Sequence, residues 1–310
     1  MFPRTAALRR RTRYILAFCL AAALSAVPPA RAQSNTLETT LRQYGETTVR
    51  GYIQPLADLF AANMSSGYYH SAGIPAGRVR VALDIVAMGT KVEDKHRTYT
   101  ARTPEGFTPE SFETATVFGG QGTTVTDPSG AEYRGSDGFI DADYLPSAVP
   151  QLTVSFLRTE ATVRYLPSSA FKSFLEEQDF PETSLIGLGL RHDIGQYLPM
   201  LPLDLSIGAF YSAVEMKDIV DFSGLSVGVQ ASKAFSMLTL YGGLASESGT
   251  MRLTYTPSDP SEAPVDLDVD AEGGIRMTGG ALLRLGFLQV FGDASVGPFT
   301  AYSGGIRIGF

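Results

Sequence analysis

The sequence has almost no cysteine or histidine, the residues of thiol chemistry and of most zinc sites. Its 310 residues include one cysteine, Cys19, three histidines and no tryptophan. Cys19 lies in an N-terminal apolar run, and Phe18 before it does not suit a lipid-attachment site. Without that run the chain has no thiol, which excludes a disulfide framework and cysteine-based metal or redox sites. After Val27 no apolar run reaches the roughly 20 residues of a transmembrane helix, so strands of a closed barrel must make any membrane crossing.

An export signal is predicted at the N-terminus. Arginines crowd residues 4–13, an apolar run covers 14–27, and Ala30-Arg31-Ala32 is a small-x-small cleavage site. Together these predict a cleaved signal peptide over residues 1–32, because the run is too short for a membrane anchor. The removed segment carries six arginines and no acidic residue, which takes the net charge from −7 to −13. That charge disfavours nucleic acid as a partner.

Residues 77–310 are dominated by period-two alternation, the pattern of strands with one apolar face. The last strand is typical: the outward face, and the predicted membrane-insertion signal, consists of Tyr302, Ile306, Ile308 and Phe310. We predict an all-β fold, an antiparallel transmembrane β-barrel of about ten strands, with eight to 14 compatible with the pattern. Short turns near 233–236 and 287–288 and long connections at 167–183 and 247–273 fit the periplasmic and external ends of such a barrel. The predicted location is the bacterial outer membrane.

Residues 33–76 are predicted to form a short helical segment at or in the periplasmic mouth. Apolar residues recur at helical spacing over 35–64, and Pro55 should divide the segment into two helices. Residues 65–77 are small and polar and suit a linker. Two interpretations stay open: a plug or gate inside the barrel, or a periplasmic helix that packs against its rim.

Two regions are harder to interpret. Residues 113–126 alternate weakly and could form another crossing. Residues 151–166 are long enough for a strand, but their alternation changes phase, which a β-bulge near Leu157 would repair. A short helix is predicted at 170–177.

Charged residues recur on the inward side of the predicted strands. A barrel of this size is mostly filled by side chains, so these charges form either a structural network or a narrow, cation-lined path for anionic or amphipathic solutes. The candidates for lining the lumen are Arg80, Asp84, Glu160, Arg164, Arg191, Arg276, Arg284, Asp293 and Arg307.

Motifs for metal binding or catalysis are weak. Asp266, Asp268 and Asp270 alternate and are weak candidates for calcium, since the glycine and distant glutamate of an EF-hand are missing. His192 and Asp193 are neighbours on a strand and point to opposite faces, and no G-x-S-x-G motif is present. We therefore expect no enzyme and no cofactor.

Several motifs resemble an uncharacterised family of exported outer-membrane barrel proteins. They are Tyr52–Ala57, Ser66–Ala72, Thr159–Pro167 and Gly189–Pro199. The resemblance spans most of the mature chain and implies fold and location. The layout is also similar to that of outer-membrane long-chain fatty-acid transporters, which hold an N-terminal hatch in the barrel. However, this chain has fewer predicted strands and lacks an Asn-Pro-Ala-type hatch motif.

Three functions follow as hypotheses. The first is passive transport of a small hydrophobic or amphipathic solute. The second is a closed structural or surface-binding barrel that acts through acidic external loops. The third is a barrel-embedded lipid hydrolase that would depend on His70 or His192. The expected partners are outer-membrane lipid, the barrel-assembly machinery and a hydrophobic small molecule.

Overall fold

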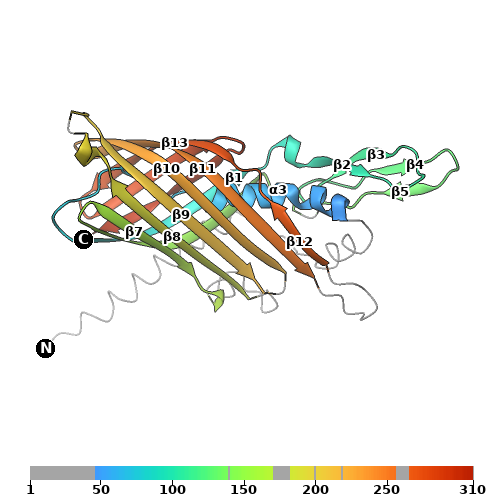
Figure 1. The fold of residues 1–310 in the computed structure, drawn as a ribbon, viewed down its shortest axis with the longest axis horizontal. Coiled ribbons are helices and arrows are strands. Elements are labelled where there is room, and N and C mark those ends of the chain that lie inside the picture. Colours follow the sequence, from blue (N-terminus) through green and yellow to red (C-terminus); the bar gives the residue numbers. More distant parts are fainter. Residues whose placement is uncertain are drawn as a thin grey trace.

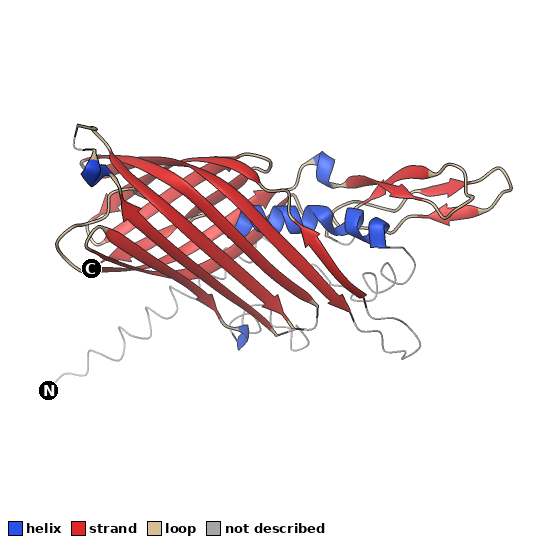
Figure 2. Ribbon diagram, viewed as in Figure 1, coloured by secondary structure: helices blue, strands red, loops and turns tan. Residues whose placement is uncertain are grey.

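The computed structural model describes residues 46–309, except 139, 170–181, 199, 218 and 256–264. Ten antiparallel strands close into a barrel because β10 pairs with β11 and β1 pairs with β15 (Figures 1 and 2). The barrel strands are β1 (Arg80–Lys91), β6 (Tyr144–Phe156), β7 (Thr159–Leu166), β8 (Thr183–Asp193), β9 (Asp204–Met216), β10 (Val220–Phe235), β11 (Leu238–Tyr255), β13 (Gly274–Leu285), β14 (Leu288–Val296) and β15 (Ala301–Gly309). A further strand, β12 (Val265–Asp270), pairs only with the far half of β11. The predicted fold class is confirmed.

The two ends of the barrel differ. At one end, the short-turn end, β10 and β13 turn directly into β11 and β14, and β1 begins beside the last residues of β15. At the other end, the long-loop end, residues 92–143 leave the barrel as an extended arm (Figure 1). The arm contains η1 (Asp94–His96), β2 (Thr98–Arg102), β3 (Ser111–Ala115), β4 (Thr124–Thr126) and β5 (Glu132–Arg134), paired as two small hairpins. A turn of 3₁₀-helix, η2 (Gly195–Tyr197), lies between β8 and β9.

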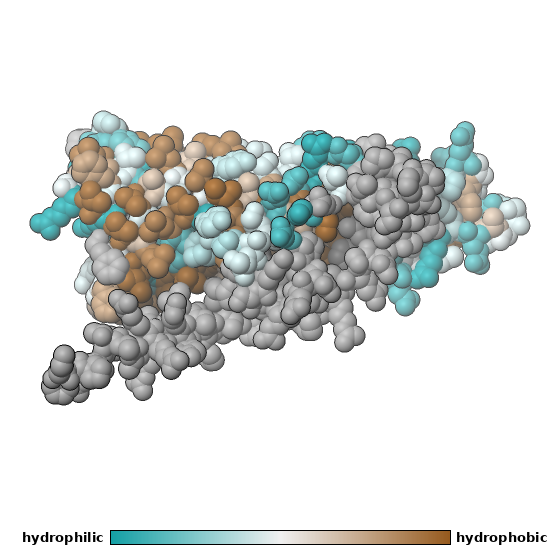
Figure 3. Space-filling view, turned by 90° about the horizontal axis from the view of Figure 1, so that it is seen from below, coloured by the Kyte–Doolittle hydropathy of each residue, from teal (hydrophilic) through white to brown (hydrophobic). Residues whose placement is uncertain are grey.

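The alternation places apolar side chains on the outer face of the strands and most of their polar side chains inside, together with buried aromatic and aliphatic ones. On β10, Leu225, Val227 and Val229 are exposed, whereas Ser226 and Gln230 are buried. On the face shown in Figure 3, hydrophobic residues gather over the barrel strands, whereas the visible part of the arm is mostly hydrophilic. A soluble barrel would reverse this arrangement, because apolar area in water is costly.

The phase change within residues 151–166 is a turn and not a bulge. Leu157 and Arg158 have φ of 48° and 60°, and the strand divides there into β6 and β7. Two consecutive residues with positive φ make the tight hairpin turn whose twist matches that of paired strands. The expected crossing at 113–126 is also wrong, because these residues form β3, β4 and their connection in the arm. The two errors cancel in the strand count.

The N-terminal helix, α3 (Glu46–Met64), lies at the long-loop end and not at the short-turn end, where the sequence analysis put it. It runs through Pro55 without dividing into two helices. Ile53, Ala57 and Leu59 are buried on both sides of the proline, so packing at the mouth outweighs the roughly 3 kcal/mol cost of an interior proline. The short helix predicted at 170–177 lies outside the described residues. No helix in the described part of the chain is long and apolar enough to cross a membrane.

Candidate functional site

Residues 65–77, which we call the plug, run through the inside of the barrel. The plug begins where α3 ends, with the Ser66 hydroxyl donating to the Ala62 carbonyl over 2.8 Å. Further along, the Tyr68 hydroxyl lies 2.7 Å from Ser212 Oγ on β9. It ends at the short-turn end, where the Pro75 carbonyl accepts the Arg158 N–H over 3.0 Å. The small, polar residues of this segment predict a linker, whereas in the structure the segment lies inside the barrel.

Arg164 on β7 binds the plug near its start, toward the long-loop end. Its side chain is fully buried, and Nη2 donates to the Ser66 carbonyl over 2.8 Å while Nη1 reaches the Met64 carbonyl at 3.3 Å. Its guanidinium lies 3.5 Å from the centre of the Tyr68 ring, within cation–π range. Its Nε donates to Gln151 Oε1 over 2.8 Å, and Nη1 also lies 3.6 Å from the Met88 sulfur. The plug, the end of α3 and the wall therefore share in stabilising this buried charge.

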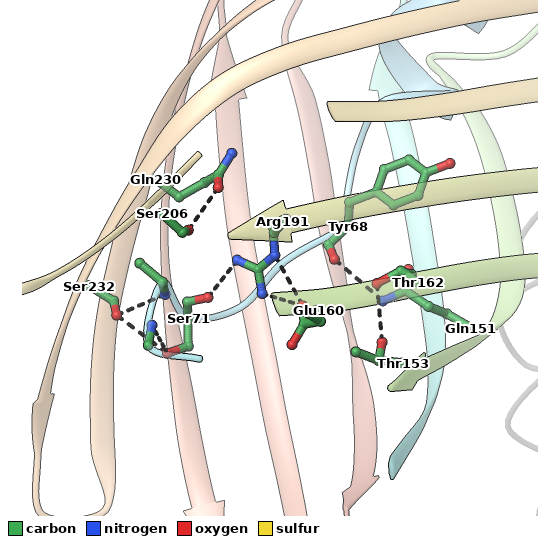
Figure 4. A network of polar contacts seen from close by, with 12 residues as sticks. Tyr68, Ser71, Gln151, Thr153, Glu160, Thr162, Arg191, Ser206, Gln230 and Ser232 are labelled. Atoms are coloured by element: carbon green, nitrogen blue, oxygen red, sulfur yellow. Dashed lines mark hydrogen bonds and ion pairs between the residues drawn. The ribbon is translucent and has the colours of Figure 1, made fainter. Parts of the chain in front are cut away.

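Arg191 on β8 binds the plug farther along, toward the short-turn end (Figure 4). It forms an ion pair with Glu160 on β7, and its Nη1 donates to the Ser71 carbonyl over 2.7 Å. The Ser71 and Ser232 hydroxyl oxygens lie 3.3 Å apart, and Ser232 Oγ accepts the Ala72 N–H over 2.9 Å. One wall arginine and one wall serine thus hold two consecutive plug residues.

Arg276 on β13 binds the junction between α3 and the plug. Its Nη1 donates to the Ala62 carbonyl over 2.8 Å, and its Nη2 donates to the Ser65 carbonyl over 2.6 Å. Glu247 on β11 lies 2.9 Å from Nη2 as the counter-ion. A cavity of about 20 Å³ lies between Arg276, Glu247 and Asp58, which is room for about one water molecule. Burial raises the pKa of the Asp58 carboxyl on α3.

The other candidate lumen residues divide into two groups. Arg307 and Asp84 form an ion pair at 2.6 Å across the β1–β15 pairing, and the Tyr241 and Ser303 hydroxyls donate to Asp293 over 2.9 and 2.7 Å. Together with Glu160, Arg164, Arg191 and Arg276, these residues lie inside the barrel. Arg80 is exposed and Arg284 is half-buried, both near the short-turn end.

Sequence reasoning missed the aromatic packing of the plug. The His70 ring is buried and stacks on Phe291 with ring centres 3.4 Å apart, and Tyr68 stacks on Phe210 at 4.6 Å. Within the described residues, neither ring nitrogen of His70 has a hydrogen-bond partner. The available signal was the Tyr-Tyr-His run between small residues, which is unusual for a solvated linker.

The weak calcium candidates do not converge. Asp266 pairs with Arg252 on β11, and Thr250 donates to Asp270 over 3.0 Å. In the described residues, no group of three or more His, Cys, Asp or Glu side chains could hold a metal ion. These acids instead stabilise the β11–β12 pairing through cross-strand contacts.

His192 lies on the outer surface near the short-turn end. Its Nδ1 is 3.0 Å from Thr159 Oγ1, which at first suggests a nucleophile and a base. However, the Gln196 amide N–H₂ donates to the Asp193 carbonyl and lies 2.9 Å from His192 Nε2. Nε2 is then the acceptor, so Nδ1 carries the proton and donates to Thr159. In that tautomer the imidazole cannot take a proton from the hydroxyl, and the geometry does not favour hydrolysis.

The residues of the predicted membrane-insertion signal follow the outward side of β15. Tyr302 is exposed, and Ile306 and Ile308 are half-buried. Phe310 lies outside the described residues.

Solved structures similar to the chain are outer-membrane barrels, with low scores. The toluene transporter TodX of P. putida is 12% identical over 76% of this chain and 68% of its own, with a TM-score of 0.23. The translocator domain of the autotransporter NalP from Neisseria meningitidis is 11% identical over 91% and 98%, with a TM-score of 0.23. Salmonella typhi OmpF is 9% identical over 76% and 98%, with a TM-score of 0.21. These scores are too low to support a functional assignment.

None of the curated proteins matches the chain. A family model does match, over residues 11–310, and it includes the four motifs on which the family resemblance was based. The chain therefore belongs to the family of unknown function DUF6588.

Proposed function

We propose that this protein is a bacterial outer-membrane barrel whose short-turn end faces the periplasm. The exposed apolar strand faces support a lipid environment. Aromatic side chains lie near both rims of the outer surface, as in the girdles of membrane barrels. They are Phe156, Tyr197, Phe235 and Phe287 at the short-turn end and Tyr144, Tyr165 and Tyr302 toward the long-loop end.

The separation of these aromatic groups fits a membrane. Tyr144 and Phe156 begin and end β6. The strand between them is roughly 40 Å long at about 3.3 Å per residue. A strand tilt of about 40° reduces this to about 30 Å of height, enough to flank an apolar band of about 25 Å. The outward residues of β15 are then available to the barrel-assembly machinery.

We propose that the barrel is a passive channel that its own plug closes. The observation that carries this proposal is the chemistry of the plug: between Ser65 and Gly77 it has no acidic or basic side chain except His70. The wall arginines bind it through its backbone carbonyls. Water can replace such contacts if the plug moves, because the ion pairs of Arg191, Arg276 and Arg307 lie within the wall.

The proposed solute is small and amphipathic. The wall around the plug carries both charged groups and aromatic rings, Phe210 and Phe291 among them, so a solute with a polar and an apolar part has partners of both kinds there. Arg164 is the lumen arginine whose hydrogen bonds go to neutral groups, namely Gln151, the Met88 sulfur and the Met64 and Ser66 carbonyls. Displacement of the plug would leave this cation available to an anionic group on the solute.

The test is a reversible lock on the plug. In Ser71→Cys/Ser232→Cys, two positions with hydroxyl oxygens 3.3 Å apart become a disulfide between plug and wall. The matched control is Thr153→Cys/Thr162→Cys, whose hydroxyl oxygens lie 3.4 Å apart on neighbouring wall strands. We expect voltage-induced conductance in a planar bilayer that oxidation abolishes, and reductant restores, only in the plug–wall pair. Conductance unaffected by the lock would contradict the proposal.

A closed barrel is the second candidate function. The number of buried contacts on the plug favours it, because each must be exchanged for water when the plug moves. In that case the arm at the long-loop end would carry the activity. Silence of the reduced plug–wall variant, from protein that still shows a heat-modifiable band, would favour this candidate.

A further inference from the structure

We infer that the barrel carries its own N-terminal helix across the membrane, so that α3 stands on the outer face as the base of the arm. This inference rests on the proposed outer-membrane location. It concerns delivery of a folded element to the cell surface, which is separate from solute transport.

The plug runs in one direction through the lumen. Tyr68 contacts Ser212 in the second half of β9, and Gly73 lies beside Asp204, where β9 begins at the short-turn end. Ala72 binds Ser232, near the end of β10, and Pro75 binds the β6–β7 turn at Arg158. The chain therefore travels from the long-loop end to the short-turn end before β1 begins.

The first barrel strand begins, and the last one finishes, at the short-turn end, whereas α3 lies at the long-loop end. Ala82, near the start of β1, pairs with Gly309 at the end of β15. In barrels with an even number of strands and short periplasmic turns, this is the periplasmic end. A chain exported through the periplasm can bring α3 to the far end only along the barrel interior, either through the finished ring or while the ring closes around the plug.

Once there, α3 supports the arm. The Val117 N–H donates to the Tyr52 carbonyl over 3.2 Å, and the Tyr52 hydroxyl donates to the Asp137 carbonyl over 2.7 Å. Gly51 lies against the Tyr99 ring so closely that an added Cβ would meet it at 2.6 Å. The arm, which follows β1 in the chain, thus packs on a helix that precedes the plug.

The same helix also binds the extension of the barrel wall. Arg50 Nη1 donates to the Asp268 carbonyl over 2.6 Å, and Gln54 Nε2 donates to the Asp270 carbonyl over 2.7 Å. Both acceptors are on β12. α3 therefore joins the arm to the β11–β12 hairpin, and the long-loop surface cannot complete its fold until the helix has arrived.

The experiment is cysteine labelling of intact cells with a membrane-impermeant maleimide, on the full chain. Gln54→Cys and Arg50→Cys report on α3, Gly120→Cys on the arm and Gly77→Cys on the short-turn end. Gly77 and Gly120 suit this purpose because an added Cβ at either position meets no atom within 4 Å. Labelling is normalised to that of the folded protein in detergent, where both ends are accessible.

We expect the α3 and arm positions to label in intact cells close to their detergent level, and Gly77→Cys to label only after permeabilisation. If Gly120→Cys labels but neither α3 position does, the helix is not delivered and the inference is wrong, while the proposed orientation stands. If Gly77→Cys labels in intact cells and Gly120→Cys does not, the proposed orientation fails, and this inference fails with it.

Discussion

The guanidinium of Arg164 lies 3.5 Å from the centre of the Tyr68 ring, and this contact joins a wall strand to the plug. Tyr68→Leu removes both the ring face and the hydroxyl that contacts Ser212, whereas Tyr68→Phe removes only the hydroxyl. A desolvated cation–π contact contributes about 2 kcal/mol, so the Leu variant should be destabilised by about that much relative to the Phe variant. Urea unfolding of the refolded barrel in lipid measures the difference. Equal stability of the two variants would mean that the stacking contributes nothing.

Gly187 on β8 has no side chain, and the Tyr68 hydroxyl of the plug occupies the space that a side chain would need. A Cβ at this position would lie 2.5 Å from the Tyr68 hydroxyl and 3.0 Å from Arg164 Cβ. Gly187→Ala should therefore displace Tyr68 and destabilise the closed barrel by about 1–3 kcal/mol, the usual cost of overpacking. It should also increase channel opening in a bilayer. Gly279→Ala is the control, because an added Cβ there meets no atom within 4 Å.

Asp84 and Arg307 face each other where the first and last barrel strands pair. Asp84→Asn leaves the mostly buried arginine without a counter-ion, which costs about 3–5 kcal/mol. The variant should lose its heat-modifiable gel band at a lower temperature than the unmodified protein. The exchanged pair Asp84→Arg/Arg307→Asp should recover part of the loss. No recovery would indicate that shape, and not charge, matters at this position.

His96 gives the arm a pH dependence. Burial, with a smaller effect of Lys95, lowers the pKa of the imidazole, whose Nδ1 accepts the Glu93 N–H over 3.0 Å. A lowered histidine pKa means that the unfolded segment binds the proton more tightly. The stabilisation is therefore complete above the ordinary value of about 6.5 and declines as the pH falls below it.

Hydrogen exchange in residues 93–116 should thus be faster at pH 5 than at pH 7.5, after correction for the intrinsic exchange rate. His96→Asn keeps an acceptor near the Glu93 N–H but does not titrate in this range, so it should remove the difference. A difference that persists in this variant would assign the pH effect to another group.

The sequence was sufficient to predict the barrel but not what fills it. A side-chain period of two identifies the strands, because one face of each meets lipid. The turn at Leu157 and Arg158 could not be predicted from the sequence, because both residues adopt positive φ although neither is a glycine. The arm strands β4 and β5 were missed because they are three residues each and have no buried face.

The position of α3 could not be predicted because helical periodicity identifies an apolar face but not the surface that covers it. The charges at 84, 164, 191 and 276 were identified by strand parity. The binding of the three arginines to carbonyls of the plug and of the end of α3 was not visible in the sequence, because a backbone carbonyl has no sequence signature. The plug itself is short, small and uncharged, and these properties also describe a linker.

The plug leads directly into β1, the strand that completes the ring by pairing with β15. The strand pair that closes the ring is therefore β1 with β15, and β1 is directly connected to the plug. The barrel can therefore insert into the membrane without an intermediate whose lumen is open and empty. Assembly can then proceed without leakage of ions or small metabolites, whatever later opens the finished barrel.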